Sequence, residues 1–146
     1  MISRNLLAFT AGAICAILAG CVQGEAYQPL PVPVAKSVIY LYRPYDFYSA
    51  AIAPMVTCGQ ESIEMEAGGY YSFVNDTGPV TCAATNEAST PLKFDAHPGQ
   101  EYYVKEEVSP GNLAGRTQFT LMSTEGGRGE IASCRKQGMP DTGSHH

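Results

Sequence analysis

The stretch from Val56 to Cys82 reads VTCGQESIEMEAGGYYSFVNDTGPVTC and has a cysteine near each end. Val56 and Cys58 lie two positions apart, and Val80 and Cys82 repeat that spacing. Alternate side chains of a β-strand point to the same face, so each cysteine shares a face with a valine. The glycine pair at 68–69 and the run NDTGP divide the stretch into short segments, as turns do. If the valine faces point inward, the two sulfur atoms meet between neighbouring strands.

Short strands are predicted over the whole of residues 37–137. Runs rich in β-branched and aromatic residues alternate there with turn sequences such as HPG and PGN. This spacing favours a single antiparallel β-sandwich of the transthyretin or immunoglobulin type. The run GEIASCRKQ (129–137) predicts a short C-terminal helix with Ile131 and Cys134 on one side. Both faces of the first run, SVIYLYR, are apolar, as in a strand buried inside a sandwich: Val38, Tyr40 and Tyr42 lie on one face, Ile39 and Leu41 on the other.

The first 21 residues, MISRNLLAFTAGAICAILAGC, predict an export signal. Arg4 precedes an apolar run that ends at Leu18, and small residues follow, as in a secretory signal peptide over residues 1–20. The run is too short for a membrane-spanning helix, which needs ~20 apolar residues. Its end, LAGC, resembles the lipobox of bacterial lipoproteins, which implies acyl chains, palmitate among them, on Cys21. Val22 stands where inner-membrane lipoproteins tend to have Asp, so the resemblance implies the outer membrane, facing the periplasm.

Residues 21–36 are predicted to form a lipidated cysteine followed by a proline-rich linker. Pro29, Pro31 and Pro33 favour polyproline II, a semi-rigid conformation of ~3.1 Å per residue. Such a linker would hold the domain away from the membrane. Residues 138–146 are predicted to be a disordered tail.

A disulfide between Cys58 and Cys82 is the favoured interpretation of the two cysteines. An exported chain meets an oxidising compartment, where disulfides persist. Zinc sites and redox motifs use closely spaced ligands, and neither cysteine has a neighbouring Cys or His. Two separately buried thiols remain the alternative. Cys134 is expected to be buried and free, although it could pair with either of the others.

The order of motifs resembles domain-of-unknown-function family 2846, small bacterial lipoproteins and secreted domains. The motifs are YLYRP after Val38, then VTC, GGYYSF, VTCAAT and PGQEYYV, and the likeness extends to about Ile131. One departure is Gly78-Pro79, where the family usually has Pro-Gly. The resemblance implies a β-sandwich, implies paired cysteines at Cys58 and Cys82 in some members, and carries over no catalytic residue.

No catalytic site, cofactor or metal site is predicted. Asp95 and His97 precede Pro-Gly and fit a turn better than a catalytic relay. The acidic residues of SIEMEAG and of VKEEV, Glu106 and Glu107 among them, fit the solvated face of strands. The alternative is a pair of acids that cleaves glycans, for example Glu64 and Glu66.

The predicted function is a non-enzymatic, lipid-anchored envelope protein that contacts another protein or maintains envelope integrity. A contact patch is expected at Arg43, Tyr45, Phe47 and Tyr48, because aromatic residues and Arg are enriched at interfaces. The formal net charge of −5 argues against nucleic acid, and no small-molecule substrate is evident. The alternatives are a tether or assembly subunit of a secretion machine and an inhibitor of a periplasmic hydrolase.

Overall fold

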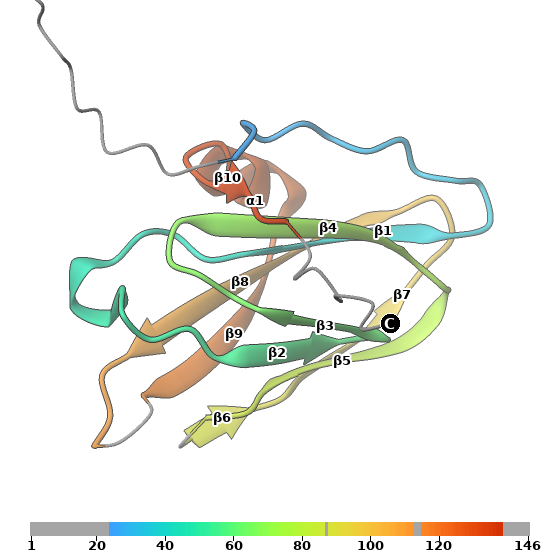
Figure 1. Cartoon of the computed structure of the whole chain (residues 1–146). Helices are drawn as coiled ribbons and strands as arrows, with labels where there is room; N and C mark the ends of the chain where they lie inside the picture. Colours follow the sequence, from blue (N-terminus) through green and yellow to red (C-terminus); the bar gives the residue numbers. More distant parts are fainter. Residues whose placement is uncertain (1–23, 87, 113–114, 139–146) are drawn as a thin grey trace, which may run out of the picture.

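The structure, a computed structural model, describes residues 24–86, 88–112 and 115–138 and confirms the all-β sandwich (Figure 1). A six-stranded sheet, with strand order β10-β4-β1-β8-β9-β6, packs against a four-stranded sheet of order β3-β2-β5-β7. The strands are β1 (Ser37–Tyr42), β2 (Met55–Cys58), β3 (Glu61–Glu64), β4 (Gly69–Asn75), β5 (Gly78–Ala84), β6 (Ala88–Thr90), β7 (Leu92–Ala96), β8 (Glu101–Ser109), β9 (Arg116–Met122) and β10 (Arg135–Lys136).

The two sheets differ in strand direction. All pairs of the four-stranded sheet are antiparallel, as the sequence predicts. In the six-stranded sheet, however, β1 pairs with β8 in parallel, and so do β10 with β4 and β6 with β9. Parallel neighbours need a long connection. The chain between β1 and β8 is such a connection, and it includes all four strands of the opposite sheet.

Strand β1 lies in the middle of the six-stranded sheet and is buried on both faces, as its composition predicts. Ile39 and Leu41 face the four-stranded sheet and belong to the core between the sheets. Tyr40 and Tyr42 face the other way, into a second apolar cluster on the outer side of the sheet. Each residue of β1 is fully buried, which explains its nearly continuous apolar sequence.

Cys58 and Cys82 form a disulfide inside the core between the sheets. They lie directly opposite each other in the antiparallel pair β2–β5. Val56 and Val80 are buried beside them, so the predicted inward face is confirmed. Cys134 is a free, buried cysteine, also as expected.

The segment before β1 corrects the prediction of a linker that stands away from the domain. Tyr27, Leu30 and Val32 pack on the second cluster. The Tyr27 hydroxyl is hydrogen-bonded to the Tyr103 hydroxyl at 2.7 Å, and the Leu30 N–H donates to the Tyr40 hydroxyl at 2.7 Å. The tyrosines on the outer face of the sheet need both an apolar cover and partners for their hydroxyls, and this segment supplies them.

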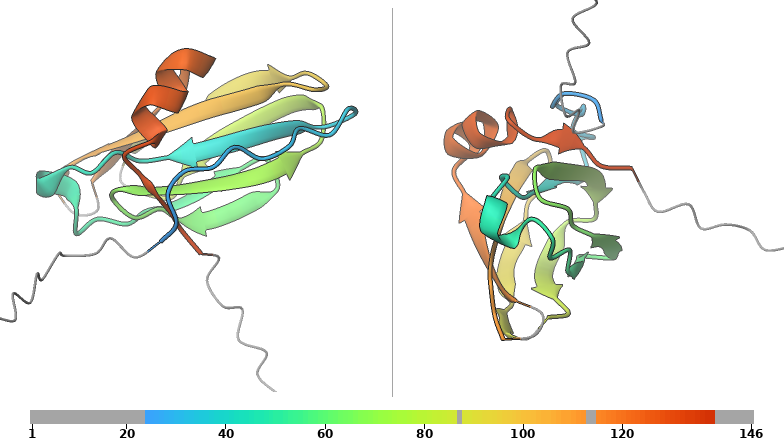
Figure 2. Two further views of the ribbon diagram at one scale, coloured as in Figure 1. Left: turned by 90° about the horizontal axis from the view of Figure 1, so that it is seen from above. Right: turned by 60° about the vertical axis from the view of Figure 1, so that its left-hand side comes forward.

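The helix also differs in position from its prediction over 129–137. Helix α1 (Thr124–Ile131) begins where the Ser123 side chain accepts a hydrogen bond from the Gly126 N–H. It covers the outer side of the six-stranded sheet, on the same side as the segment before β1 (Figure 2). Three glycines lower the helix propensity of TEGGRGEI and conceal the helix in the sequence.

Gly127 is required for this packing, which gives a test of the placement of α1. A Cβ at Gly127 would lie 2.3 Å from Tyr103 Cβ, whereas a Cβ at Gly129 would meet nothing within 4 Å. We expect Gly127→Ala to lower the free energy of unfolding by about 1–3 kcal/mol through overpacking. Gly129→Ala, the matched control, should instead raise it by about 0.5–1 kcal/mol through helix propensity. Urea unfolding of both variants measures the difference, and equal effects would show that α1 is placed wrongly.

Candidate functional site

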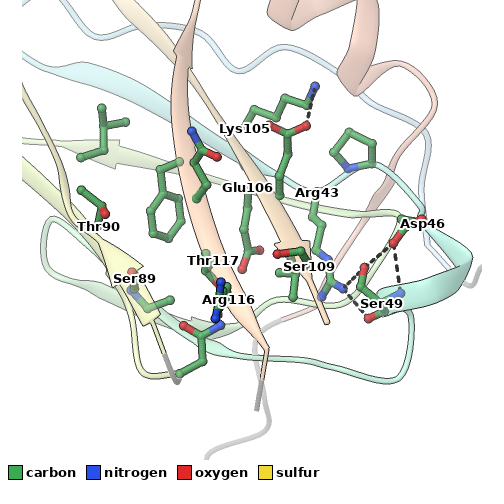
Figure 3. Close-up of a pocket in the computed structure, with 18 of the residues that line it drawn as sticks. Arg43, Asp46, Ser49, Ser89, Thr90, Lys105, Glu106, Ser109, Arg116 and Thr117 are labelled. Atoms are coloured by element: carbon green, nitrogen blue, oxygen red, sulfur yellow. Dashed lines mark hydrogen bonds and ion pairs between the residues drawn. The ribbon is translucent and has the colours of Figure 1, made fainter. Parts of the chain in front are cut away.

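A pocket of about 1450 Å³ opens at one end of the sandwich (Figure 3). Both sheets contribute to it: β8 and β9 form one side, and the ends of β5, β6 and β7 form the other. The loop after β1, which includes the short 3-10 helix η1 (Phe47–Ser49), forms part of its edge. The pocket therefore lies where the apolar core between the sheets ends.

Strand alternation places Glu106 inside this pocket. On β8, Val104 and Val108 face the core, and Glu106 lies between them in the same alternation. Its partner across the β8–β9 ladder is Phe119, which also belongs to the core. Glu106 is 0% exposed, so its prediction as part of a solvated face is wrong.

The Glu106 carboxyl has no hydrogen-bond partner among the described residues, at either oxygen. Burial raises its pKa to about 8, and the positive charge of Arg43 opposes this rise only in part. Glu106 is therefore mostly protonated at neutral pH. An unpaired carboxyl in an apolar setting is costly, so its presence at the pocket calls for a functional reason.

Arg43 follows β1 and is also buried, at 1% exposed. Its guanidinium donates to the carbonyl oxygens of Met65 at 3.1 Å and Ile52 at 2.5 Å, and to both the carbonyl and the hydroxyl of Ser49, at 2.7 and 3.2 Å. Its hydrogen-bonding capacity is directed to the protein interior. This placement corrects the expected contact patch, because Arg43 is not available on the surface.

The Arg43 network fixes the loop that carries the aromatic residues of that patch. The Asp46 carboxylate accepts hydrogen bonds from the Ser49 N–H at 3.0 Å and the Ser49 hydroxyl at 2.7 Å, which cap η1. The same hydroxyl hydrogen bond is the main reason that the pKa of Asp46 is lowered. Asp46, Ser49 and Arg43 thus form one hydrogen-bonded unit at the edge of the pocket (Figure 3).

Three aromatic side chains project from this fixed loop. Tyr45 is 63% exposed, Phe47 77% and Tyr48 81%. The rings of Phe47 and Tyr48 pack edge to face, with centroids 5.8 Å apart. We call Tyr45, Phe47 and Tyr48 the aromatic loop. It borders the pocket, since Tyr45 and the neighbouring Asp46 are among the residues that line the pocket.

Asn86 provides a second buried acceptor beside the pocket. Its amide nitrogen donates to the Thr117 hydroxyl at 2.5 Å. Its side-chain oxygen is buried and has no partner among the residues that the structure describes. Glu106 and Asn86 both line the pocket, so unsatisfied acceptors gather at this end of the sandwich.

The other candidate residues of the sequence lie elsewhere. Asp95 lies in β7, one residue before its end, and His97 begins a turn in which Gly99 has a φ of 73°, in agreement with the predicted turn. Glu64 and Glu66 are exposed near the end of β3, away from the pocket. Cys21, the predicted lipid attachment site, lies outside the described residues.

Within the described ranges, no group of three or more His, Cys, Asp and Glu residues could hold a metal ion. The same ranges contain no helix that is both long and apolar enough to cross a membrane. Comparison of the chain with models of protein families, with curated proteins and with solved structures found no match. The resemblance to family 2846 therefore stays a prediction.

The sequence did not identify Glu106 and Asn86 as pocket residues. For Glu106 a signal was present: in EYYVKEEVS the apolar residues Val104 and Val108 define one face, and Glu106 falls on it. Treating VKEEV as one acidic cluster concealed this alternation. Asn86 carries no comparable pattern in the sequence.

Proposed function

We propose that this chain is a non-enzymatic, lipid-anchored protein of the cell envelope that contacts a partner protein through the aromatic loop. The observation that carries the proposal is the exposure of Tyr45, Phe47 and Tyr48 on one short, internally hydrogen-bonded loop. The disulfide-linked β-sandwich is the scaffold that supports this loop.

Exposed aromatic groups that cluster on a fixed loop favour protein contact. Aromatic side chains are enriched in the buried centres of interfaces and dominate hot spots there. A loop held in place before binding loses less conformational entropy when the partner arrives. The hydrogen bonds of Arg43 and Asp46 provide this preorganisation.

The lipid anchor proposed at Cys21 would lie close to the folded domain. Gly24 is three residues further along the chain, and Glu25 is tied to the body where the Lys136 N–H donates to its carbonyl at 2.7 Å. Three residues span at most ~11 Å. The packed segment before β1 therefore supports a domain that sits near the membrane surface.

Replacing Tyr45, Phe47 and Tyr48 together by alanine tests the contact surface. We expect the triple variant to lose at least tenfold in partner recovery when the lipidated protein is captured from crosslinked native envelopes, because each hot-spot aromatic is worth ~2 kcal/mol or more. The matched control is Val74→Ala with Leu121→Ala, two exposed apolar residues on other elements. Mass spectrometry quantifies the partner against an unrelated lipoprotein. Equal recovery with the triple variant and with the control would refute the proposal.

Replacing Cys21 by serine tests the anchor separately. The variant has no thiol to acylate, so we expect it to lose palmitate labelling and to leave the membrane fraction. Cys134→Ser is the control that should keep both, since Cys134 is buried in the domain. Palmitate labelling of the Cys21 variant at the wild-type level would exclude this attachment site.

A further inference from the structure

We infer that the pocket around Glu106 is a binding site for a small basic molecule, whose guanidinium or ammonium group pairs with the Glu106 carboxylate. The site adjoins the aromatic loop, because Tyr45 lines the pocket, but the inference does not depend on the protein contact proposed for that loop. Its lining combines buried residues, Glu106 and Thr117 among them, with exposed ones such as Arg116.

The first argument is the unsatisfied hydrogen-bonding capacity at the site. Buried polar groups in folded proteins nearly always have partners, and exceptions need an explanation. Here the two oxygens of Glu106 and the side-chain oxygen of Asn86 lack partners among the described residues. Both residues line one pocket, where a ligand that donates hydrogen bonds would satisfy these oxygens.

The second argument is that both terminal guanidinium nitrogens of Arg43 already donate hydrogen bonds to other groups. Arg43 is the charged neighbour that acts on Glu106, but its guanidinium donates to Ile52, Met65 and Ser49 and makes no ion pair with Glu106 within the described residues. Figure 3 shows the Glu106 carboxyl pointing into the space between Arg43 and Thr117. A ligand in the pocket would supply the missing donor for the carboxylate.

The other charged groups described at the pocket do not pair with the Glu106 carboxylate, so a cationic ligand can do so. On β8, Lys105 pairs with Glu107 at 3.5 Å and, through α1, with Glu130 at 3.2 Å. From the loop, the Asp46 carboxylate is bound to Ser49. From β9, Arg116 is exposed and could receive an anionic group of the ligand at the pocket mouth. Among the described residues, those of β5, β6 and β7 that line the pocket are uncharged.

A cation also explains why a titratable residue stands here. Without a cationic partner, desolvation holds Glu106 mostly protonated at neutral pH. A guanidinium or ammonium group would stabilise the ionised form, because a charge-assisted hydrogen bond is strong where water is excluded. Binding then releases one proton from Glu106 to solvent, and the carboxylate keeps the electron pair of the O–H bond.

The test uses L-arginine as the probe and L-citrulline as its uncharged counterpart of nearly the same shape. With the purified full-length chain, we expect arginine to shift the amide NMR signals of β8 and β9 around Glu106. Citrulline should bind at least about tenfold more weakly, because its urea group lacks the charge. Glu106→Gln should lower the affinity for arginine by a similar factor, whereas Glu64→Gln, an exposed residue of β3 away from the pocket, should not.

The pH dependence of the affinity for arginine distinguishes a binding role of Glu106 from a merely structural one. Since the carboxylate is the binding form, affinity for arginine should rise nearly tenfold per pH unit up to about pH 8 and then level off. Glu106→Gln should remove this slope. The inference is overturned if arginine shows no binding up to about 10 mM, if citrulline binds equally well, or if Glu106→Gln binds like the wild type. Each result can be obtained whether or not the aromatic loop contacts a partner.

Discussion

Replacing Cys58 and Cys82 together by alanine is expected to lower the free energy of unfolding by about 3–4 kcal/mol. The disulfide joins residues with a sequence separation of 24, and closing such a loop in the unfolded chain accounts for this amount in the chain-entropy model. A domain of this size has a total stability of ~5–15 kcal/mol. The crosslink therefore supplies a large share of it.

Urea unfolding with and without a strong reductant isolates the contribution of the disulfide. The reductant should destabilise the wild type by nearly the same amount as the double substitution, and it should leave the double variant unchanged. Cys134→Ala is the control: this free cysteine is buried, so its loss costs some packing, but the variant should keep the full effect of the reductant. A wild type whose stability does not respond once the bond is shown by mass to be reduced would contradict the prediction.

Replacing Glu106 by glutamine is expected to stabilise the domain, increasingly so as pH rises. The folded protein holds the Glu106 proton up to a pKa of about 8, while the unfolded chain releases it near 4.5. Between these values the unfolded state binds fewer protons, so the wild type loses stability as pH rises, by about 1.4 kcal/mol per pH unit. Glutamine has no proton to lose.

The difference in unfolding free energy between Glu106→Gln and the wild type should therefore grow by roughly 2–4 kcal/mol from about pH 5 to about pH 8. All other titrating groups are common to both proteins and cancel in this difference. Glu107→Gln changes an exposed carboxylate on the same strand and should show a difference within about 0.5 kcal/mol across the range. If the difference in unfolding free energy for Glu106→Gln does not change with pH, the Glu106 carboxyl is solvated or paired. A residue that costs stability in this way is typical of a binding site.

Alternation along strands predicted most of the sandwich. Tyr40 and Ile39 were assigned to opposite buried faces, and the structure places them in separate apolar clusters. The shared spacing of Val56 with Cys58 and of Val80 with Cys82 predicted the inward disulfide. These features depend on local geometry, which a sequence records directly.

Features that depend on tertiary contacts were predicted poorly. The proline-rich segment lacks regular structure, but Tyr27 and Leu30 cover an apolar face that only the folded sheet creates. Helix α1 contains Gly127 because the Tyr103 ring leaves no room for a side chain, and no propensity rule anticipates this. The parallel pairing of β1 with β8 likewise joins strands far apart in the chain.

The candidate site was predicted only in part. The three aromatic residues of the loop are exposed, as a contact patch requires, but Arg43 is buried and holds the loop from inside. The pocket depends on where two sheets separate, which the sequence does not encode in any one segment. Glu106 becomes informative only when its burial and its lack of a partner are known together.

Titration of the Glu106 side-chain carboxyl carbon by NMR tests the central claim most directly. The signal is assigned by comparing the wild type with Glu106→Gln, and its chemical shift is followed across the pH range in the ligand-free protein. A buried, unpaired carboxyl at the pocket predicts a midpoint near pH 8. A Glu106 midpoint near the ordinary value of 4.5 would contradict the account, because the carboxyl would then be solvated or already paired.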